Sequence, residues 1–436
     1  MRPDMIERVK LFYKRIFSSE FARSTFILAS GTAIAQVISL ITAPILTHIY
    51  LPEYYGLLGL FMLVSGIGGA LSTFQYHNAI ITARDDDEAE LAVTITGGIC
   101  VVVSCISLAL VVFFNAPLAI MVGSADLQNW LYLVPLSIFF TGISTALYAY
   151  ATRRKEFKSI TVIRLIATVA SPFFSITFGL ISAGPAGIIL GLMISQAIPT
   201  IVLLIRYVVK RKVTIRKEPE ALLLVLKKYK NFPKFSLPSE FINNVSNQIP
   251  ILMLSHTAGT AAVGFFNLSN RLLGLPAQLL SASVGEVFRQ KAAQDFHETG
   301  TCRPIFLKVF KTLLRIAIIP FAVLLLLGPQ IFTFFFGAKW TEAGQFSQIL
   351  GILFMFKFIV SPLSYVTYIA NKQWVGLITD ILLLSTVLLI FLAAKWLHLP
   401  YKISLLIYSL SYSALYFLTF YLSYRFSNIK SYAVKT

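Results

Sequence analysis

The chain has 436 residues, of which 57% are hydrophobic and 13% charged, and its formal net charge at pH 7 is +18. An ordinary soluble domain carries about 25% charged residues, so this composition excludes a typical soluble protein. A basic excess suggests nucleic-acid binding in a soluble protein. In this chain the basic residues gather in the connectors between apolar stretches, which explains the positive net charge without nucleic acid. We therefore expect no nucleic-acid partner.

Apolar stretches follow one another from Phe21 to Phe426, most of them long enough to cross a bilayer. About 20 helical residues at roughly 1.5 Å each span the roughly 30 Å hydrocarbon core. The sequence therefore predicts an all-α integral membrane protein with about twelve transmembrane helices. They are expected near residues 22–46, 55–81, 91–114, 130–152, 159–182, 186–208, 238–256, 261–288, 312–336, 344–370, 374–395 and 402–425.

Lys and Arg gather in alternate connectors. They cluster at 153–158 and 206–234, whereas 47–54, 115–129 and 257–261 contain neither. This bias predicts that both termini are cytoplasmic and that the number of spans is even. Residues 1–19 are basic and amphipathic without an apolar core, so no cleavable signal is expected. The expected organisation is a cytoplasmic N-terminus (1–21), an N-lobe of helices 1–6 (22–208), a basic cytoplasmic connector (209–237), a C-lobe of helices 7–12 (238–425) and a cytoplasmic C-terminus (426–436).

The second half of the chain restarts the pattern of the first. Pro44 recurs as Pro250, 206 positions later, and Gly56 recurs as Gly264, 208 positions later, each with similar apolar neighbours. Six spans separate the two starts, so both halves enter the membrane in the same direction. This predicts two six-helix lobes related by a pseudo-two-fold axis along the membrane normal, an architecture of transporters whose lobes rock around a central site.

Polar residues recur at helical spacing in the seventh and eighth predicted spans and more weakly in the first and the second. In the second span they are Ser65, Ser72, Gln75, Tyr76 and His77. A face of this kind belongs against protein or a water-filled cavity. We expect these side chains to line a substrate cavity, with hydrogen bonding between helices as the open alternative. The candidates are Gln36, Asn244, Asn247, Gln248, Asn267 and Gln278.

Charged residues discriminate better, because Lys or Arg at a helix centre costs about 2.5 to 3.5 kcal/mol on insertion scales. Arg271 and Lys357 lie mid-span, and we expect them to line the cavity and meet a polar ligand. Arg23 and Arg84 lie at the cytoplasmic ends of the first two spans, where they are either cations of a cytoplasmic entrance or interfacial anchors. The remaining charges lie nearer to span ends and are interpreted as structural: Arg164, Arg315, Glu286 and Asp380.

Motifs of soluble enzymes are missing from the sequence. No Gly-rich phosphate loop, HExxH, GxSxG or metal-spaced Cys/His cluster occurs, so no catalytic residue, metal or cofactor is expected. The acidic run Asp85–Glu88 is interpreted as a solvated turn and helix cap rather than a site for a metal-bound nucleotide sugar. Three cysteines, Cys100, Cys105 and Cys302, suggest no disulfide framework.

Several stretches carry a resemblance to a known family. They are Phe232-Pro233-Lys234-Phe235-Ser236-Leu237-Pro238, Gln248-Ile249-Pro250, Ala262-Val263-Gly264-Phe265-Phe266 and Arg271-Leu272-Leu273-Gly274-Leu275-Pro276. With Tyr54-Tyr55-Gly56 and Ser361-Pro362-Leu363-Ser364, the chain resembles the Wzx-type oligosaccharide flippases of O-antigen and other polysaccharide pathways. These belong to the multidrug/oligosaccharidyl-lipid/polysaccharide exporter superfamily. One departure is Gln75-Tyr76-His77, where the family often has an Arg-Tyr-Glu-type triplet.

The resemblance implies two six-helix lobes around a cavity that opens alternately to each side of a bacterial inner membrane. It also implies a lipid-pyrophosphate-linked oligosaccharide, usually on undecaprenol, as in lipopolysaccharide synthesis. We therefore expect a flippase working by rocking-bundle alternating access, not an enzyme, with this glycolipid and membrane lipids as partners. The sequence leaves open whether a coupling cation is used. The alternatives are a cation-coupled multidrug exporter, which needs buried carboxylates, and a membrane-embedded glycan polymerase or ligase, which needs a large extracytoplasmic loop.

Overall fold

The computed structural model describes residues 20–181, 184–210, 219–370, 372 and 374–428, without the side chains of 20–29, 208–210, 276–283, 286, 297 and 377. All regular structure in this part of the chain is helical. The helices are α2 (Glu20–Ile49), α3 (Pro52–Leu71), α4 (His77–Thr82), α5 (Asp86–Val122), α6 (Gln128–Leu131), α7 (Val134–Arg153), α8 (Phe157–Ile181), α9 (Ala186–Leu204), α10 (Pro219–Lys228), α11 (Leu237–Thr299), α12 (Arg303–Phe336), α13 (Thr341–Leu363), α14 (Val366–Ile369), α15 (Trp374–Trp396) and α16 (Tyr401–Phe426). Short 3-10 turns (η1, Ala125–Leu127; η4, Ala338–Trp340) and π-helical turns (η2, Ile205–Lys210; η3, Phe232–Ser236) join some of them.

Eleven helices in the described residues are long and apolar enough to cross a membrane. Large apolar side chains lie outward on them; Phe113 is 78% exposed, Leu180 75% and Phe334 81%. Water would not tolerate so much exposed apolar surface, but lipid does. The predicted all-α membrane protein is therefore confirmed. The count of eleven takes α11 once, although it holds both the seventh and the eighth predicted spans.

The predicted break between the seventh and eighth spans is present. Gly259, within the expected connector at 257–261, has non-helical backbone (φ 77°, ψ −177°) and divides α11 into two helical parts. Glycine reaches this conformation without a steric penalty. The prediction of one continuous second span was wrong, because α3 stops at Leu71 and α4 starts at His77. Between them Phe74 (φ 45°) and Gln75 (φ 62°) are left-handed. A right-handed helix cannot continue through such residues.

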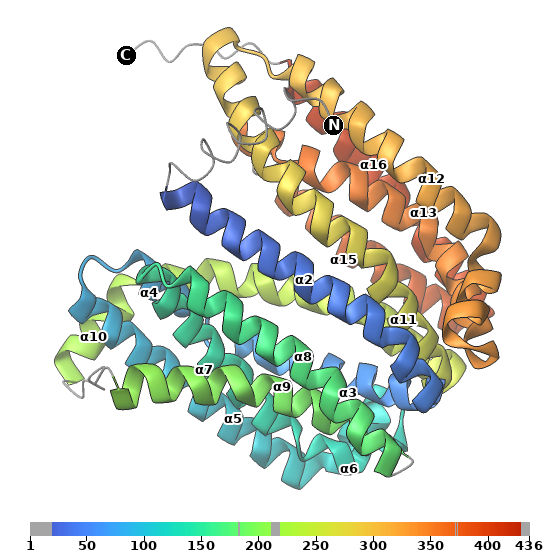
Figure 1. Ribbon diagram of the computed structural model, residues 1–436, viewed down its shortest axis with the longest axis horizontal. Coiled ribbons are helices and arrows are strands. Elements are labelled where there is room, and N and C mark those ends of the chain that lie inside the picture. Colours follow the sequence, from blue (N-terminus) through green and yellow to red (C-terminus); the bar gives the residue numbers. More distant parts are fainter. Residues whose placement is uncertain (1–19, 182–183, 211–218, 371, 373, 429–436) are drawn as a thin grey trace, which may run out of the picture.

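Two bundles make up the molecule, an N-terminal bundle of α2 to α9 and a C-terminal bundle of α11 to α16 (Figure 1). We call the end formed by connectors 47–54, 115–129 and 257–261 the lysine-poor end, and the end formed by 153–158 and 206–234 the basic end. In Figure 1 the bundles converge at the right, near α6, and diverge towards the left, where α4 and α10 lie. They therefore meet at the lysine-poor end.

Glycines of α3 and α11 make the closest contact between the bundles. A Cβ atom at Gly56 would lie 2.6 Å from the carbonyl carbon of Thr260 and closer still to its oxygen. A Cβ atom at Gly264 would lie 2.9 Å from the carbonyl carbon of Pro52 and 3.1 Å from the amide nitrogen of Gly56. Small residues of this kind let two membrane helices approach at backbone distance. The two glycines that mark the internal repeat thus meet each other.

Further contacts close the lysine-poor end. The fully buried Trp340 of the C-terminal bundle donates its indole N–H to the Thr47 carbonyl at 3.0 Å and packs edge-on against Tyr55, with ring centroids 5.0 Å apart. Ser255 Oγ donates to the Val122 carbonyl at 2.7 Å. A buried indole N–H needs such a partner, because an unsatisfied donor is costly. The bundles are therefore connected at this end by buried side chains and hydrogen bonds.

The connector between the bundles is attached to the N-terminal one. Val225 of α10 is 5% exposed and belongs to a core cluster with residues of α4, α5, α7 and α9. Lys228 forms an ion pair with Glu88, and Tyr76 donates its hydroxyl to the Leu226 carbonyl at 3.2 Å. Asp85 accepts the Glu88 N–H at 2.8 Å at the start of α5, which confirms the predicted helix cap. The acidic run therefore fastens the connector as well as starting α5.

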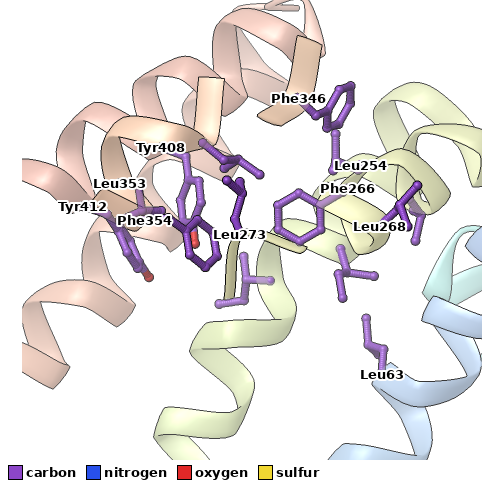
Figure 2. Close-up of a cluster of buried hydrophobic side chains, with 14 of the residues drawn as sticks. Leu63, Leu254, Phe266, Leu268, Leu273, Phe346, Leu353, Phe354, Tyr408 and Tyr412 are labelled. Carbon is purple, nitrogen blue, oxygen red and sulfur yellow. The ribbon is translucent and has the colours of Figure 1, made fainter. Parts of the chain in front are cut away.

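The larger apolar core runs from the contact region into the C-terminal bundle. Figure 2 shows part of it, with Phe266 and Leu273 of α11 lying near Phe354 of α13 and Tyr408 of α16. These four side chains are all buried. α11 passes through this region and contributes side chains to each of the three spaces described next.

Candidate functional site

Three spaces between the helices are joined in a row. A central pocket of about 530 Å³ lies between α2, α3, α8, α9 and α11. An N-terminal pocket of about 500 Å³ adjoins it and shares Met62. A C-terminal pocket of about 490 Å³ adjoins it on the other side and shares Asn270. Each volume falls within the range of about 300 to 1,000 Å³ that is usual for ligand sites.

The central pocket combines one charge with several neutral polar groups. Arg271 and Asn267 of α11 line it together with Gln36 of α2, three of the side chains expected there from the sequence. Hydroxyls of α8 and α9 complete the polar lining, from Thr168, Ser171, Ser175 and Ser195. Of the described residues lining this pocket, Arg271 carries the net charge. A guanidinium presents a fork of N–H donors that matches a phosphate or carboxylate.

The C-terminal pocket holds the second expected cation. Lys357 of α13 lines it with Asn247 of α11, as does Asp380 of α15. Tyrosines of α16 form one wall, and Figure 2 shows Tyr408 and Tyr412 there beside Phe354. The pocket therefore contains an acid, a base and phenol rings at membrane depth. Charges at such depth are costly and are found where helices enclose a functional site.

The N-terminal pocket contains no Lys or Arg among the described residues that line it. Asn244 of α11, another expected residue, lies here beside Glu240. The break between α3 and α4 supplies Gln75 and His77, and α7 and α9 supply hydroxyl and amide groups. This pocket is polar without being basic.

Three polar atoms at the contact between α3 and α11 are buried without a hydrogen-bond partner in the described part of the chain. They are Tyr55 Oη, Asn267 Nδ2 and Asn244 Oδ1. A buried polar atom left unsatisfied costs about 1 to 3 kcal/mol. The contact is thus stabilised by packing and weakened by these unsatisfied atoms.

The other expected site residues lie in different places. Gln248 lies at the α3–α11 contact, with its Nε2 3.5 Å from a Cβ atom built on Gly66. Arg84 is exposed near the basic end, where its backbone N–H donates to Glu88 at 2.7 Å, and it lines none of the three pockets. The side chains of Arg23 and Gln278 lie outside the described residues.

The sequence interpretation missed three residues. Asn270 joins two pockets, and its i, i+3 spacing from Asn267 was the available signal. Arg164 lines a smaller space of about 310 Å³ that shares Ala167 and Thr168 with the central pocket. Asp380, interpreted as structural, lines the pocket of Lys357. Both charges lie near predicted span ends, so distance from the end was a poor guide to whether they face a cavity.

Comparison with known proteins decides the family. The family model described as "Polysaccharide biosynthesis protein" matches residues 45–345, which is more than half of the chain. The chain belongs to this polysaccharide biosynthesis protein family. The matched region runs from the end of α2 into α13 and contains both glycines of the α3–α11 contact.

A curated relative has a name in keeping with this family, and two solved structures share the fold. The succinoglycan biosynthesis transport protein ExoT of Rhizobium meliloti is 25% identical over 348 residues, which are 77% of this chain and 65% of the relative. The chain thus spans slightly less than two thirds of the length of ExoT. The lipid II flippase MurJ in an inward closed conformation superposes with a TM-score of 0.72 at 15% identity, covering 92% of this chain and 87% of MurJ. An inward-facing multidrug resistance transporter of the MATE family superposes with a TM-score of 0.71 at 14% identity, covering 91% of this chain and 96% of the transporter. The protein is a multi-pass membrane protein with a transporter fold.

Proposed function

We propose that the protein is a flippase of the Wzx type. It moves a lipid-pyrophosphate-linked oligosaccharide from the inner to the outer leaflet of a bacterial inner membrane. Its bundles rock about the α3–α11 contact, so the cavity opens to one side at a time. The observation that carries the proposal is Arg271, a cation among amides and hydroxyls in a pocket enclosed by membrane helices.

The physical task fits this arrangement. A pyrophosphate and a sugar head group cannot cross hydrocarbon unaided, because burying an unpaired charge costs far more than the thermal energy. The polyprenyl tail of the same molecule can stay in the lipid. Arg271 neutralises phosphate charge through paired hydrogen bonds, and Lys357, across Asn270 from it, acts as a point charge for a second anionic group.

The orientation follows from the charge bias of the connectors. The basic end, with both termini, faces the cytoplasm, where anionic lipid head groups and the positive-inside rule favour Lys and Arg. The described state is then closed to the outside, because the lysine-poor end is where the bundles meet. A glycolipid made in the cytoplasmic leaflet enters from the open side.

Substitution of the two cations tests the proposal. Arg271→Lys loses the paired hydrogen bonds and should lower surface polysaccharide about ten-fold or more, whereas Lys357→Arg keeps a charge and should have a milder effect. The measurement is surface polysaccharide restored in a strain lacking the gene, divided by the amount of the protein in the membrane. Arg315→Lys, an exchange of the same kind outside the three pockets, serves as the control.

Alanine variants separate a ligand role from a structural one. Removing a mid-membrane cation lowers the insertion cost by about 2.5 to 3.5 kcal/mol, so the abundance of Arg271→Ala and Lys357→Ala should hold while surface polysaccharide falls. A double alanine variant that restores full polysaccharide would show that these side chains do not carry the pyrophosphate.

One observation favours a second function, that of a cation-coupled multidrug exporter. Asp380 faces the C-terminal pocket with three tyrosines, and a carboxylate with phenol rings suits an organic cation. Lys357 in the same pocket opposes this. Cells overproducing the protein should show unchanged resistance to cationic dyes if the flippase assignment is correct, and increased resistance that Asp380→Asn abolishes would favour the exporter.

A further inference from the structure

The N-terminal pocket differs in chemistry from the two pockets that hold cations. Its described lining includes Gln75, His77, Thr141, Gln196, Glu240 and Asn244. Small residues of α3, among them Gly66 and Gly69, leave the space open. A polar chamber of this size inside membrane helices requires a polar occupant, because lipid chains would leave its lining without partners.

Two of these residues, Gln75 and His77, lie at the break in the second span and line the pocket there. Left-handed residues such as Phe74 and Gln75 cost of order 1 to 3 kcal/mol each and persist where the surrounding structure holds them. Asn78 Nδ2 donates to Gln75 Oε1 at 3.0 Å, and His77 Nδ1 lies 2.9 Å from Thr73 Oγ1. The Nε2 atoms of Gln75 and His77 therefore keep their hydrogen-bonding capacity for a ligand.

The opposite walls supply both donors and acceptors. Ser137 Oγ donates to Gln196 Oε1 at 2.7 Å, which leaves the amide NH₂ of Gln196 to donate. The Glu240 carboxylate accepts. A hydroxyl group both donates and accepts, whereas a phosphate oxygen only accepts. This mixture therefore matches sugar hydroxyls and does not match a pyrophosphate.

The charge of the pocket narrows the kind of sugar. Among its described lining residues Glu240 is the carboxylate, and no Lys or Arg offsets it. A sugar carboxylate placed in this space would meet a like charge, which disfavours binding. A neutral sugar has no such penalty. The pocket shares Met62 with the central pocket, so a sugar here can be joined to a phosphate near Arg271.

We propose that the N-terminal pocket is a sugar subsite that accepts a neutral sugar residue of the lipid-linked substrate and rejects an acidic one. This proposal rests on the proposed function, because it assumes that the phosphates bind near Arg271. Gln75, Gln196 and His77 hold the hydroxyls, and Glu240 provides the selection against carboxylates.

Binding of three synthetic lipids to the purified full-length protein in nanodiscs tests the subsite. The probes are a polyprenyl pyrophosphate without sugar, the same lipid with one galactose, and the same lipid with one glucuronate. Wild-type protein should bind the galactose lipid about three- to ten-fold more tightly than the sugar-free lipid, as expected for one or two added hydrogen bonds. The glucuronate lipid should show no such gain.

Variants of the pocket residues test whether the tighter binding of the galactose lipid comes from this pocket. Gln75→Gly and Gln196→Ala should each remove most of the galactose gain without changing affinity for the sugar-free lipid. Glycine is used at Gln75 because this residue has a φ of 62°. Glycine adopts that left-handed conformation without strain, so folding is preserved. Glu240→Gln should improve glucuronate binding severalfold and leave galactose binding unchanged. Gln128→Ala, at an exposed position of α6, is the matched control.

The outcomes separate this inference from the proposed function. Equal affinity of wild-type protein for all three lipids, or a galactose gain that survives in Gln75→Gly and Gln196→Ala, overturns the sugar subsite while the flippase stands. No binding of any of the three lipids by wild-type protein overturns the proposed function, and the subsite with it.

Discussion

Adding a methyl group at Gly56 should push the bundles apart at the lysine-poor end. The new Cβ atom would lie 2.6 Å from the Thr260 carbonyl carbon and closer to its oxygen, and both are backbone atoms that no side-chain rotation can move. Overpacking of this kind costs about 1 to 3 kcal/mol. The cost falls on the conformation in which α3 and α11 touch, so the equilibrium should shift about 5- to 150-fold towards the separated one.

The intrinsic helix preference of alanine does not obscure this effect. Alanine is favoured over glycine by about 1 kcal/mol in a helix, but α3 is helical whether or not it touches α11. The gain therefore cancels between the two conformations. Gly98→Ala provides the matched control, because a Cβ atom there has no atom within 4 Å among those compared, and it should leave the equilibrium unchanged.

Spin labels across the lysine-poor end measure the shift. Cysteines replace the exposed Gln128 of the N-terminal bundle and the exposed Lys339 of the C-terminal bundle, in a protein lacking its three native cysteines. Double electron–electron resonance measures the distance between the two spin labels. We expect mainly a short distance in the parent protein and a larger fraction of long distances in the Gly56→Ala variant. An unchanged distribution with Gly56→Ala in well-folded protein would refute the argument that this contact sets the closed state.

Two further predictions concern the ends of the molecule. An impermeant maleimide added outside intact cells should label a cysteine at Gln128 and spare one at Lys230; the reverse pattern would invert the proposed orientation. Glu88→Gln should speed amide hydrogen exchange in α10 a few-fold, because it removes the ion pair of Lys228, while Asp126→Asn should not. Equal exchange would show that the ion pair does not hold the connector and that apolar packing and the Tyr76–Leu226 hydrogen bond do. The hydrogen bond to Glu88 raises the pKa of Lys228, so while Glu88 is ionised this stabilisation is complete below the ordinary lysine pKa and is lost as the pH rises through the raised value. At low pH it is lost as Glu88 is protonated, at a pKa below the usual range for glutamate.

The sequence predicted the membrane helices well because hydropathy and length report directly on them. It also identified Gln36, Asn267 and Arg271, which lie on two separate helices and which the fold brings to one pocket. Their roles stay predictions until substitutions test them. Periodicity could select these residues because a polar face on a membrane helix has few alternatives to a cavity or a helix contact.

The broken second span could not be predicted in the same way. Left-handed backbone is usually signalled by glycine or asparagine, and here it falls on Phe74 and Gln75, which carry no such signal. The surrounding packing imposes that conformation, so a local pattern cannot reveal it. Periodicity did mark Gln75 and His77 as part of a weakly polar face of the second span, but it could not show that a break in the helix brings them to a pocket. Asp380 was interpreted as structural because it lies near the end of a predicted span. The sequence does not show that its side chain faces a pocket.

The internal repeat gives the two halves of the chain the same backbone frame with different side chains. At the offset of 208 residues, Gly56 corresponds to Gly264, Gly59 to Asn267 and Met62 to Asn270. The first two pairs also touch each other, and a Cβ atom at Gly59 would lie 2.9 Å from the Asn267 Cγ. Met62 and Asn270 each join the central pocket to the pocket of their own half. The pseudo-symmetry therefore extends from the contact to the cavity.

The side chains at these equivalent positions differ where a ligand would lie. Arg271 corresponds to Leu63, which is 4% exposed in the core, so one half contributes a cation where the other contributes packing. The two outer pockets differ likewise, with Lys357 in one and Glu240 as the carboxylate of the other. A glycolipid has unlike ends, and a cavity with equivalent halves would bind it in two orientations equally well. Different charges on a shared backbone frame remove that degeneracy, because only one orientation places the phosphates by the arginine and a neutral sugar by the glutamate.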